Sequence, residues 1–172
     1  AYWQAVAKQP ADIPAAAAAL EARQHHLQED FRFVARCNVG GEFLGDAEQG
    51  RLREIAITTW QRNFDNRIGL SPNEELRLDA NPLPLPVTET LLSDKPEHLI
   101  RRTGSTDYPA EFAINMEIPE YLGNLGEVYN LSISRGTLTA EDRFRINEHM
   151  ISTIKMLESL PFPEELKNVP RY

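Results

Sequence analysis

The sequence predicts a mainly α-helical fold in which helical segments flank a long proline-rich connector. Two observations favour helices: residues 15–38 open with an alanine run, and residues 139–160 carry apolar side chains at helical spacing. A third observation interrupts them, because Pro82, Pro84 and Pro86 alternate with leucines in a pattern typical of an extended, polyproline-like path. We therefore expect about four or five helices and at most one short β element.

Length and charge limit the class of protein. The chain of 172 residues suits one ordinary domain or two small units, and its net charge of −8 argues against a general nucleic-acid binder. The single cysteine, Cys37, cannot form an internal disulfide, and no apolar run approaches the roughly 20 residues that span a bilayer. We expect a cytoplasmic protein. Because the first residue is not methionine and the start reads as helix, we also expect an internal fragment of a longer protein.

The first 80 residues are predicted to be helical. A short helical piece before Pro10 precedes the main helix over residues 15–38, which Gly40-Gly41 ends. Its apolar stripe consists of Leu20, Leu27, Phe31 and Val34. A second helix is predicted over residues 46–64, because Asp46 is a good N-cap. One face of this helix carries Leu52, Ile55, Thr59 and Trp60. A capping box of Ser71 and Glu74 predicts a short third helix over residues 72–78.

The middle of the chain has little regular pattern. We expect a connector over residues 81–109, packed through the leucines between its prolines, with one helical turn at residues 95–100. The one candidate strand covers residues 112–118, where apolar side chains alternate with polar residues or alanine. Only weak candidates for its partner strand are present.

The last helix is predicted over residues 139–160. Thr139 and Asp142 form a variant of the capping box, and Pro161 ends the helix. Its apolar stripe consists of Ile146, Met150, Thr153, Ile154 and Leu157. His149 lies on that stripe, so we expect it to face the core rather than solvent.

His149 is the most informative candidate for a functional residue. A core-facing histidine can bind a metal through one ring nitrogen while a hydrogen bond holds the other. By spacing alone His149 is isolated, because no other histidine or cysteine stands at ligand spacing from it. An isolated histidine is more often a packing residue, and only its flanking sequence favours the ligand interpretation.

The flanking sequence resembles a known family. Residues 130–139 read NLSISRGTLT, and Glu148-His149, Met156-Leu157 and a PFP sequence at residues 161–163 follow. This stretch closely resembles a segment of the HD-GYP family of metal-dependent phosphohydrolases, many of which hydrolyse cyclic di-GMP. By this resemblance His149 matches a metal-binding histidine of the family. The family's His-Asp dipeptide and Gly-Tyr-Pro signature do not occur in the chain, and its His-His pair would follow Tyr172.

The preceding residues resemble, more diffusely, an insertion found in one branch of this family. Examples are DFRFVARCN at residues 30–38 and LLSDKPEH at residues 91–98. The resemblance implies three parts. These are a helical insertion over residues 1–80, a proline-rich connector over residues 81–125, and part of an HD-GYP-type catalytic helical domain over residues 126–172.

For function, the resemblance implies hydrolysis of cyclic di-GMP in bacterial-type second-messenger signalling, with iron or manganese as the metal. Only one ligand, His149, lies in this chain, so we assign no catalytic residue and expect the isolated chain to bind no metal specifically and to be inactive. The competing hypothesis is a non-catalytic helical signalling or dimerisation module. In that case His149 is a packing residue and uncovered apolar helix faces favour a homodimer.

Other candidates have simpler interpretations. His25 and His26 point about 100° apart on a helix, so we expect them to be solvated. Arg101 and Arg102 could meet a phosphate, but a solvated loop beside acidic residues is the commoner state of such a pair. Four aromatic side chains are expected in the core rather than on a stacking platform: Trp3, Trp60, Phe31 and Phe33.

Overall fold

The computed structural model describes residues 13–103, 108, 116–166 and 168–169. Among the described residues the first helix is α2, which covers Ile13–Val39 and confirms the helix predicted over residues 15–38. It ends at Gly40, whose φ of +76° suits glycine, and a Cβ there would lie 2.6 Å from Thr137 Cγ2. The helical piece predicted before Pro10 lies outside the described residues.

The second predicted helix is only partly correct. Helix α3 covers Asp46–Ala56, and the chain then enters strand β1 over Thr59–Arg62. Because residues 57–60 read ITTW, a run of β-branched and aromatic residues, they favour a strand more than a continued helix. Strand β1 pairs antiparallel with β2, Val87–Thr90, so that Thr59 lies opposite Thr90 and Arg62 opposite Val87.

A short helix lies between β1 and β2 in the sequence. Helix α4 covers Pro72–Glu75, shorter than the predicted residues 72–78, and its capping box is present. The Ser71 backbone N–H donates to Glu74 Oε2 at 2.8 Å. In the connector, Leu83 is 68% exposed and Leu85 is 48% exposed, so the prediction that these leucines pack is wrong.

A second small sheet follows. The predicted helical turn at residues 95–100 is a 3₁₀ turn, η2, over Pro96–His98, followed by strand β3 over Leu99–Arg101. Strand β3 pairs antiparallel with β4, Tyr121–Asn124. Residues 112–115 of the candidate strand lie outside the described residues, and residues 116–118 are not in a strand.

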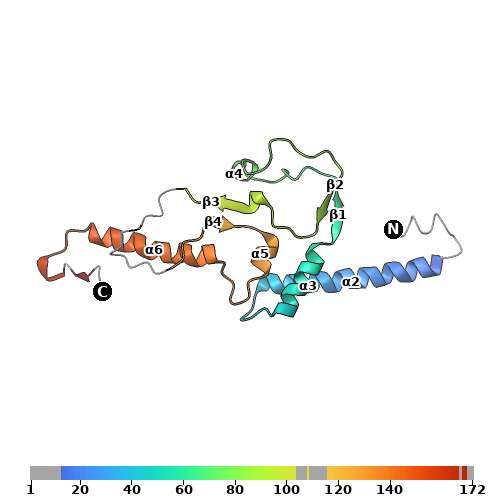
Figure 1. Ribbon diagram of the computed structural model, residues 1–172, viewed down its shortest axis with the longest axis horizontal. Helices are drawn as coiled ribbons and strands as arrows, with labels where there is room; N and C mark the ends of the chain where they lie inside the picture. The colour runs from blue at the N-terminus through green and yellow to red at the C-terminus, as the bar shows by residue number, and fades with distance from the viewer. Residues whose placement is uncertain (1–12, 104–107, 109–115, 167, 170–172) are drawn as a thin grey trace.

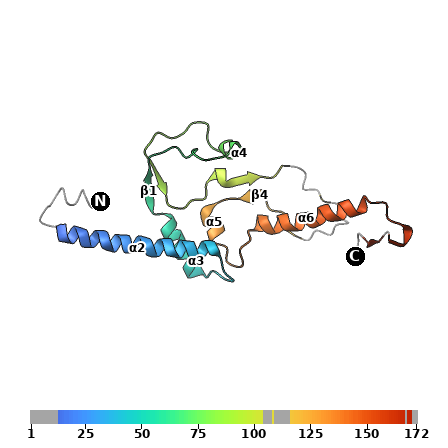
Figure 2. The ribbon, with the colours of Figure 1, turned by 180° about the vertical axis from the view of Figure 1, so that it is seen from behind.

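The C-terminal third is helical. Helix α5 covers Glu127–Leu131, α6 covers Ala140–Glu158, and a 3₁₀ turn, η4, covers Glu164–Leu166. Helix α6 confirms the helix predicted over residues 139–160. In Figures 1 and 2, β4 lies beside the start of α6, and β1 and β2 stand between α3 and α4.

The fold is mixed α/β, and the prediction of a mainly α-helical fold with at most one short β element is wrong. The described residues form four strands in two antiparallel two-stranded sheets. Each strand has only three or four residues. A period of two cannot be recognised over so few residues, and the partner strands lie far away in the sequence.

The core is small and lies where α2, α3 and α5 meet. Phe33, Leu52 and Ile55 form its centre, and Leu131 packs against them from α5. Of the four aromatic residues predicted for the core, Phe33 is buried. Phe31 is 77% exposed, Trp60 is 39% exposed and Trp3 lies outside the described residues.

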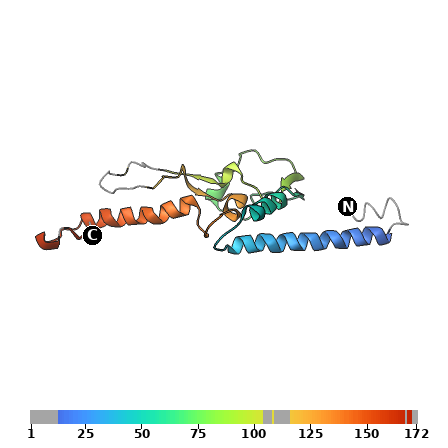
Figure 3. The ribbon, with the colours of Figure 1, turned by 60° about the horizontal axis from the view of Figure 1, so that its bottom comes forward.

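The two long helices run outward from this centre in opposite directions (Figure 3). The accessible surface of the chain is 13196 Å². A compact monomer of its mass would expose about 8,500 Å². Among the described helices, none combines the length and the apolar character that a membrane span requires.

Candidate functional site

Helix α6 begins at a capping box that its sequence predicted. The Asp142 backbone N–H donates to Thr139 Oγ1 at 3.1 Å, and the Thr139 backbone N–H donates to Asp142 Oδ2 at 3.2 Å. Two of the first N–H groups of the helix are therefore satisfied. This local arrangement fixes where α6 starts, and with it the position of His149 along the helix.

The predicted inner face of α6 is wrong. Ile146 is 54% exposed and Met150 is 61% exposed, whereas Phe144 and Ile151 are buried. His149 is exposed as well, so it faces solvent rather than the core. Helix α6 carries apolar residues on more than one side, so periodicity defines a face but not which face turns inward.

The inward face also carries two carboxylates. Glu141 is 7% exposed, and Glu148 is half-buried. The Tyr129 hydroxyl donates to Glu141 Oε2 at 2.9 Å, and the Tyr108 hydroxyl donates to Glu148 Oε1. A buried carboxylate costs free energy unless it is hydrogen-bonded, so these hydroxyls make the inward setting of α6 possible.

The surroundings of both tyrosines raise the pKa of their hydroxyls. Burial, together with the hydrogen bond to Glu141, raises the pKa of the Tyr129 hydroxyl. Burial and the hydrogen bond to Glu148 likewise raise the pKa of Tyr108. Both hydroxyls therefore keep their protons at neutral pH and act as donors.

Arg102 completes the contacts of Glu148. Its Nη1 lies 3.4 Å from Glu148 Oε1, and its Cζ lies 4.8 Å from the centre of the Phe144 ring. The Arg102 side chain is only 10% exposed, so the expectation of a solvated loop is wrong for this residue, whereas Arg101 is exposed. Because its guanidinium is engaged with Glu148 and Phe144, Arg102 is poorly placed to receive a phosphate.

Sequence reasoning missed this cluster. Tyr108 and Glu148 are 40 positions apart, and Arg102 and Glu148 are 46 apart. A glutamate in a helix normally faces water, so neither Glu141 nor Glu148 suggested an inner face. The pairing depends on tertiary structure and leaves no local signal.

The imidazole of His149 is available to a ligand. Its ring has no hydrogen-bond or ion-pair partner among the described residues, and its backbone carbonyl accepts from Thr153 Oγ1 at 2.9 Å. An exposed imidazole of this kind fits the role of one metal ligand. Within the described ranges, however, no three histidine, cysteine, aspartate or glutamate side chains are grouped to hold a metal ion. The described part of the chain therefore does not make a complete metal site.

Comparison with known protein families gives a match that includes α6. Residues 86–172, half of the chain, match the family described as HD domain. The chain belongs to the HD domain family. Comparison with the curated proteins gives no match, and neither does comparison with the solved structures.

Membership of the HD domain family gives the chemistry at a coarse level. HD domains are metal-dependent phosphohydrolases that typically bind divalent metals, with a phosphodiester as the substrate that the family suggests. Helix α6 and His149 lie within the matched part of the chain. The Arg102, Tyr108 and Glu148 side chains also lie within the matched residues.

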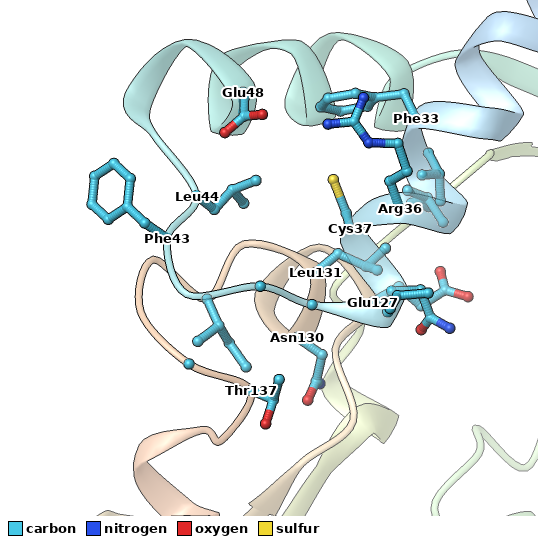
Figure 4. A pocket seen from close by; sticks show the side chains of 18 of the residues that line it. Phe33, Arg36, Cys37, Phe43, Leu44, Glu48, Glu127, Asn130, Leu131 and Thr137 are labelled. Carbon is cyan, nitrogen blue, oxygen red and sulfur yellow. The ribbon is translucent and has the colours of Figure 1, made fainter.

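One hollow in the described residues lies away from His149, which is not among its lining residues. A pocket of about 910 Å³ opens between the end of α2, the loop that follows it and α5 (Figure 4). Its wall mixes apolar side chains such as Leu44 and Leu131 with the charged Arg36 and Glu48. Burial, and to a lesser extent Glu48, raises the pKa of the Cys37 thiol in this wall, which disfavours a reactive thiolate.

The histidine pair of α2 is solvated, as its sequence predicted. Both His25 and His26 are exposed, and His26 Nε2 lies 3.2 Å from Asp30 Oδ2 one turn later. Asp30 also lies 3.6 Å from Arg51 Nη2. This local network joins α2 to α3.

Proposed function

We propose that the protein carrying this chain is an HD-GYP-type phosphodiesterase that hydrolyses cyclic di-GMP in second-messenger signalling. His149 serves as one ligand of its metal centre, and iron or manganese is the metal. The metal, when bound, supplies an activated water for attack on the phosphodiester. The remaining ligands come from outside the described residues, so this chain contributes a ligand-bearing helix rather than a whole active site.

One observation carries the proposal. The exposed, unpaired imidazole of His149 lies on α6, inside the segment that matches the HD domain family. The residues around it are those that resemble the HD-GYP segment, from residue 130 to residue 163. A packing histidine would be buried or hydrogen-bonded to its own chain, and His149 is neither among the described residues.

The parts of the chain have distinct roles under this proposal. Residues 126–172 belong to the catalytic helical domain, residues 81–125 connect, and residues 1–80 are the insertion. The ion pair between Arg102 and Glu148 supports this division, because it joins the proposed connector to helix α6. His149 then lies in the catalytic domain. We propose that this domain is cytoplasmic.

The test uses the natural full-length protein and two matched variants. His149→Ala should lose metal, measured by elemental analysis, and should no longer hydrolyse cyclic di-GMP, measured by chromatography of the products. His25→Ala removes an equally exposed helical histidine and should leave both properties unchanged. Full metal content and full activity in His149→Ala would refute the ligand role.

The substrate is tested separately. The full-length protein should cleave cyclic di-GMP faster than bis-p-nitrophenyl phosphate, a phosphodiester without nucleotide features. Cleavage of bis-p-nitrophenyl phosphate but not of cyclic di-GMP would support a metal-dependent phosphohydrolase. It would refute cyclic di-GMP as the substrate.

A second proposal concerns self-association and rests on α2. Ile13, Leu20 and Leu27 follow one another at intervals of seven, and all are exposed at 43%, 37% and 41%. Apolar residues that repeat every seven positions form one of the two rows along which helices pair in a seam. Val34, the next residue at this spacing, packs against the core. The exposed row of Ile13, Leu20 and Leu27 therefore continues the face of α2 that packs against the core at Val34. A second copy of the chain is the partner that such a seam fits.

The self-association proposal predicts a change in mass. Leu20→Glu with Leu27→Glu should convert a dimer to a monomer in light scattering, because like charges would face each other in the seam. Ala18→Glu with Ala22→Glu adds the same charge on the opposite side of α2 and should leave the dimer intact. A wild-type protein that is monomeric at every concentration would rule the dimer out.

A further inference from the structure

Two directional contacts set the rotation of α6 about its axis. Tyr129 holds Glu141 from α5, and Tyr108 holds Glu148. The two carboxylates are seven residues apart, two turns of helix, which is about 10 Å along the axis. Hydrogen bonds at two points along a helix oppose its rotation, whereas apolar contacts alone tolerate small slips.

Arg102 and Tyr108 both contact Glu148, the second of these points. The Arg102 guanidinium contacts Glu148 at 3.4 Å and lies over the Phe144 ring at 4.8 Å. The Tyr108 ring lies 6.2 Å from the same Phe144 ring. The cluster therefore joins Arg102 and Tyr108 to the inward face of α6, through ionic and hydroxyl contacts at Glu148 and ring contacts at Phe144.

The stability of the fold alone does not explain this cluster, because burying an arginine costs free energy. The Arg102 side chain is 10% exposed, and its buried Nε has no hydrogen-bond partner among the described residues. Apolar side chains of similar volume would often stabilise a helix contact as well as a buried ion pair or better. A buried arginine at this point is therefore better explained by the geometry that it imposes than by the free energy that it adds.

The geometry matters because of the next residue. His149 follows Glu148 directly and projects about 100° away from it around the helix. A fixed Glu148 therefore fixes the direction in which the imidazole leaves α6. We propose that Arg102 is a positioning residue which, through Glu148, sets the rotation of α6 and so holds His149 in the direction its metal requires. This inference rests on the proposed function of His149.

The test compares neighbouring arginines in the full-length protein. Arg102→Met removes the clamp, whereas Arg101→Met removes an exposed arginine outside the cluster. Mn²⁺ binding is measured by calorimetric titration, and the bound ion is examined by electron paramagnetic resonance. Arg102→Met should bind Mn²⁺ about 10-fold more weakly or worse, and with a changed spectrum. Arg101→Met should match the wild type in both.

A merely structural role is separated by two further measurements. Circular dichroism reports whether Arg102→Met keeps its helices, and hydrogen exchange reports the protection of α6. Tyr108→Phe removes one hydroxyl from the same carboxylate and keeps the ring, so it is the variant to use if Arg102→Met does not fold. It should weaken Mn²⁺ binding in the same direction by a smaller factor.

The outcomes are distinguishable. If Arg102→Met folds and has wild-type Mn²⁺ affinity and spectrum, the inference is overturned. If Arg102→Met does not fold, wild-type Mn²⁺ affinity in Tyr108→Phe overturns it. In either case, loss of Mn²⁺ binding in His149→Ala would leave the proposed function standing. Unchanged Mn²⁺ binding in His149→Ala would instead overturn the proposed function, and the positioning role with it.

Discussion

At the scale of single residues, the Tyr129 hydroxyl is the contact on which the inner face of α6 most depends. It donates to Glu141, a carboxylate that is 7% exposed. No other side chain donor to Glu141 is found within the described residues. Removing the hydroxyl would leave a buried carboxylate without this partner, which costs about 1–3 kcal/mol.

Tyr129 should also make the fold sensitive to alkali. Its pKa is raised above the ordinary value of 10.0 by burial and by Glu141, so the folded state holds the proton more tightly than the unfolded state. This contribution is fully present below about pH 10 and is lost as the pH rises through the raised folded value. Denaturant unfolding should show a larger alkaline loss of stability in the wild type than in Tyr129→Phe. Equal losses in the two proteins would contradict this role.

For His149, the sequence predicts the position in the helix but not the direction of the side chain. Its position in the helix followed from the Thr139 cap, which is a local signal. Its direction did not, because the partners of Glu141 and Glu148 that turn α6 lie in other elements. A helical stripe containing Ile146 and Met150 favoured the wrong side.

At the scale of elements, the β1–β2 sheet depends on a cross-strand ion pair. Two strands alone are marginally stable in water. Arg62 Nη2 lies 3.2 Å from Glu89 Oε1, with the two side chains 7% and 18% exposed. Arg62 also donates to the carbonyl of Phe64, and Lys95 Nζ lies 3.5 Å from Glu89 Oε1. The pair therefore connects both strands to the segments that follow them.

Glu89→Gln should weaken this sheet. It leaves the buried Arg62 without an anionic partner, at a cost of about 3 kcal/mol. The hydrogen bond from Arg62 lowers the pKa of Glu89, so its contribution is present above about pH 4.5 and is lost as the pH falls through the lowered folded value. Urea unfolding at neutral and acid pH should show less acid loss in Glu89→Gln. Glu54→Gln changes an exposed glutamate of α3 and should behave as the wild type.

Elements were predictable where their signal is local and repeated. Helices α2 and α6 follow from periodicity over many residues and, for α6, from the Thr139 cap. Strand β1 falls inside the helix predicted over residues 46–64, because Thr59 and Trp60 stand at helical spacing from Leu52 and Ile55. Strands β2 and β3 lie in a segment whose prolines and polar residues resemble a connector, and only their pairing defines them.

At the scale of the whole molecule, surface is large and core is small. The chain exposes 13196 Å², and its described buried apolar residues are few, with Leu52 and Phe144 the largest of those fully buried. Exposed apolar side chains lie along both long helices, including Leu20 on α2 and Met150 on α6. On α2 the row of Ile13, Leu20 and Leu27 is the part of this exposed apolar surface that best fits a contact site.

Such a molecule should depend heavily on the packed junction around Leu52. Leu52 is fully buried where α2, α3 and α5 meet, so Leu52→Ala should cost about 2–5 kcal/mol and lower the melting temperature by several degrees. Leu76→Ala truncates a leucine that is 83% exposed and should change stability by less than about 0.5 kcal/mol.

The same variant tests whether α6 is coupled to that junction. Helix α6 is joined to α5 through the Glu141–Tyr129 hydrogen bond, and α5 packs on the core through Leu131. Hydrogen exchange in Leu52→Ala should therefore accelerate in α2, α3 and α5 and also in the first turns of α6. Acceleration confined to α2 and α3 would show that α6 keeps its place without the core, held by β4 and the Arg102 cluster alone.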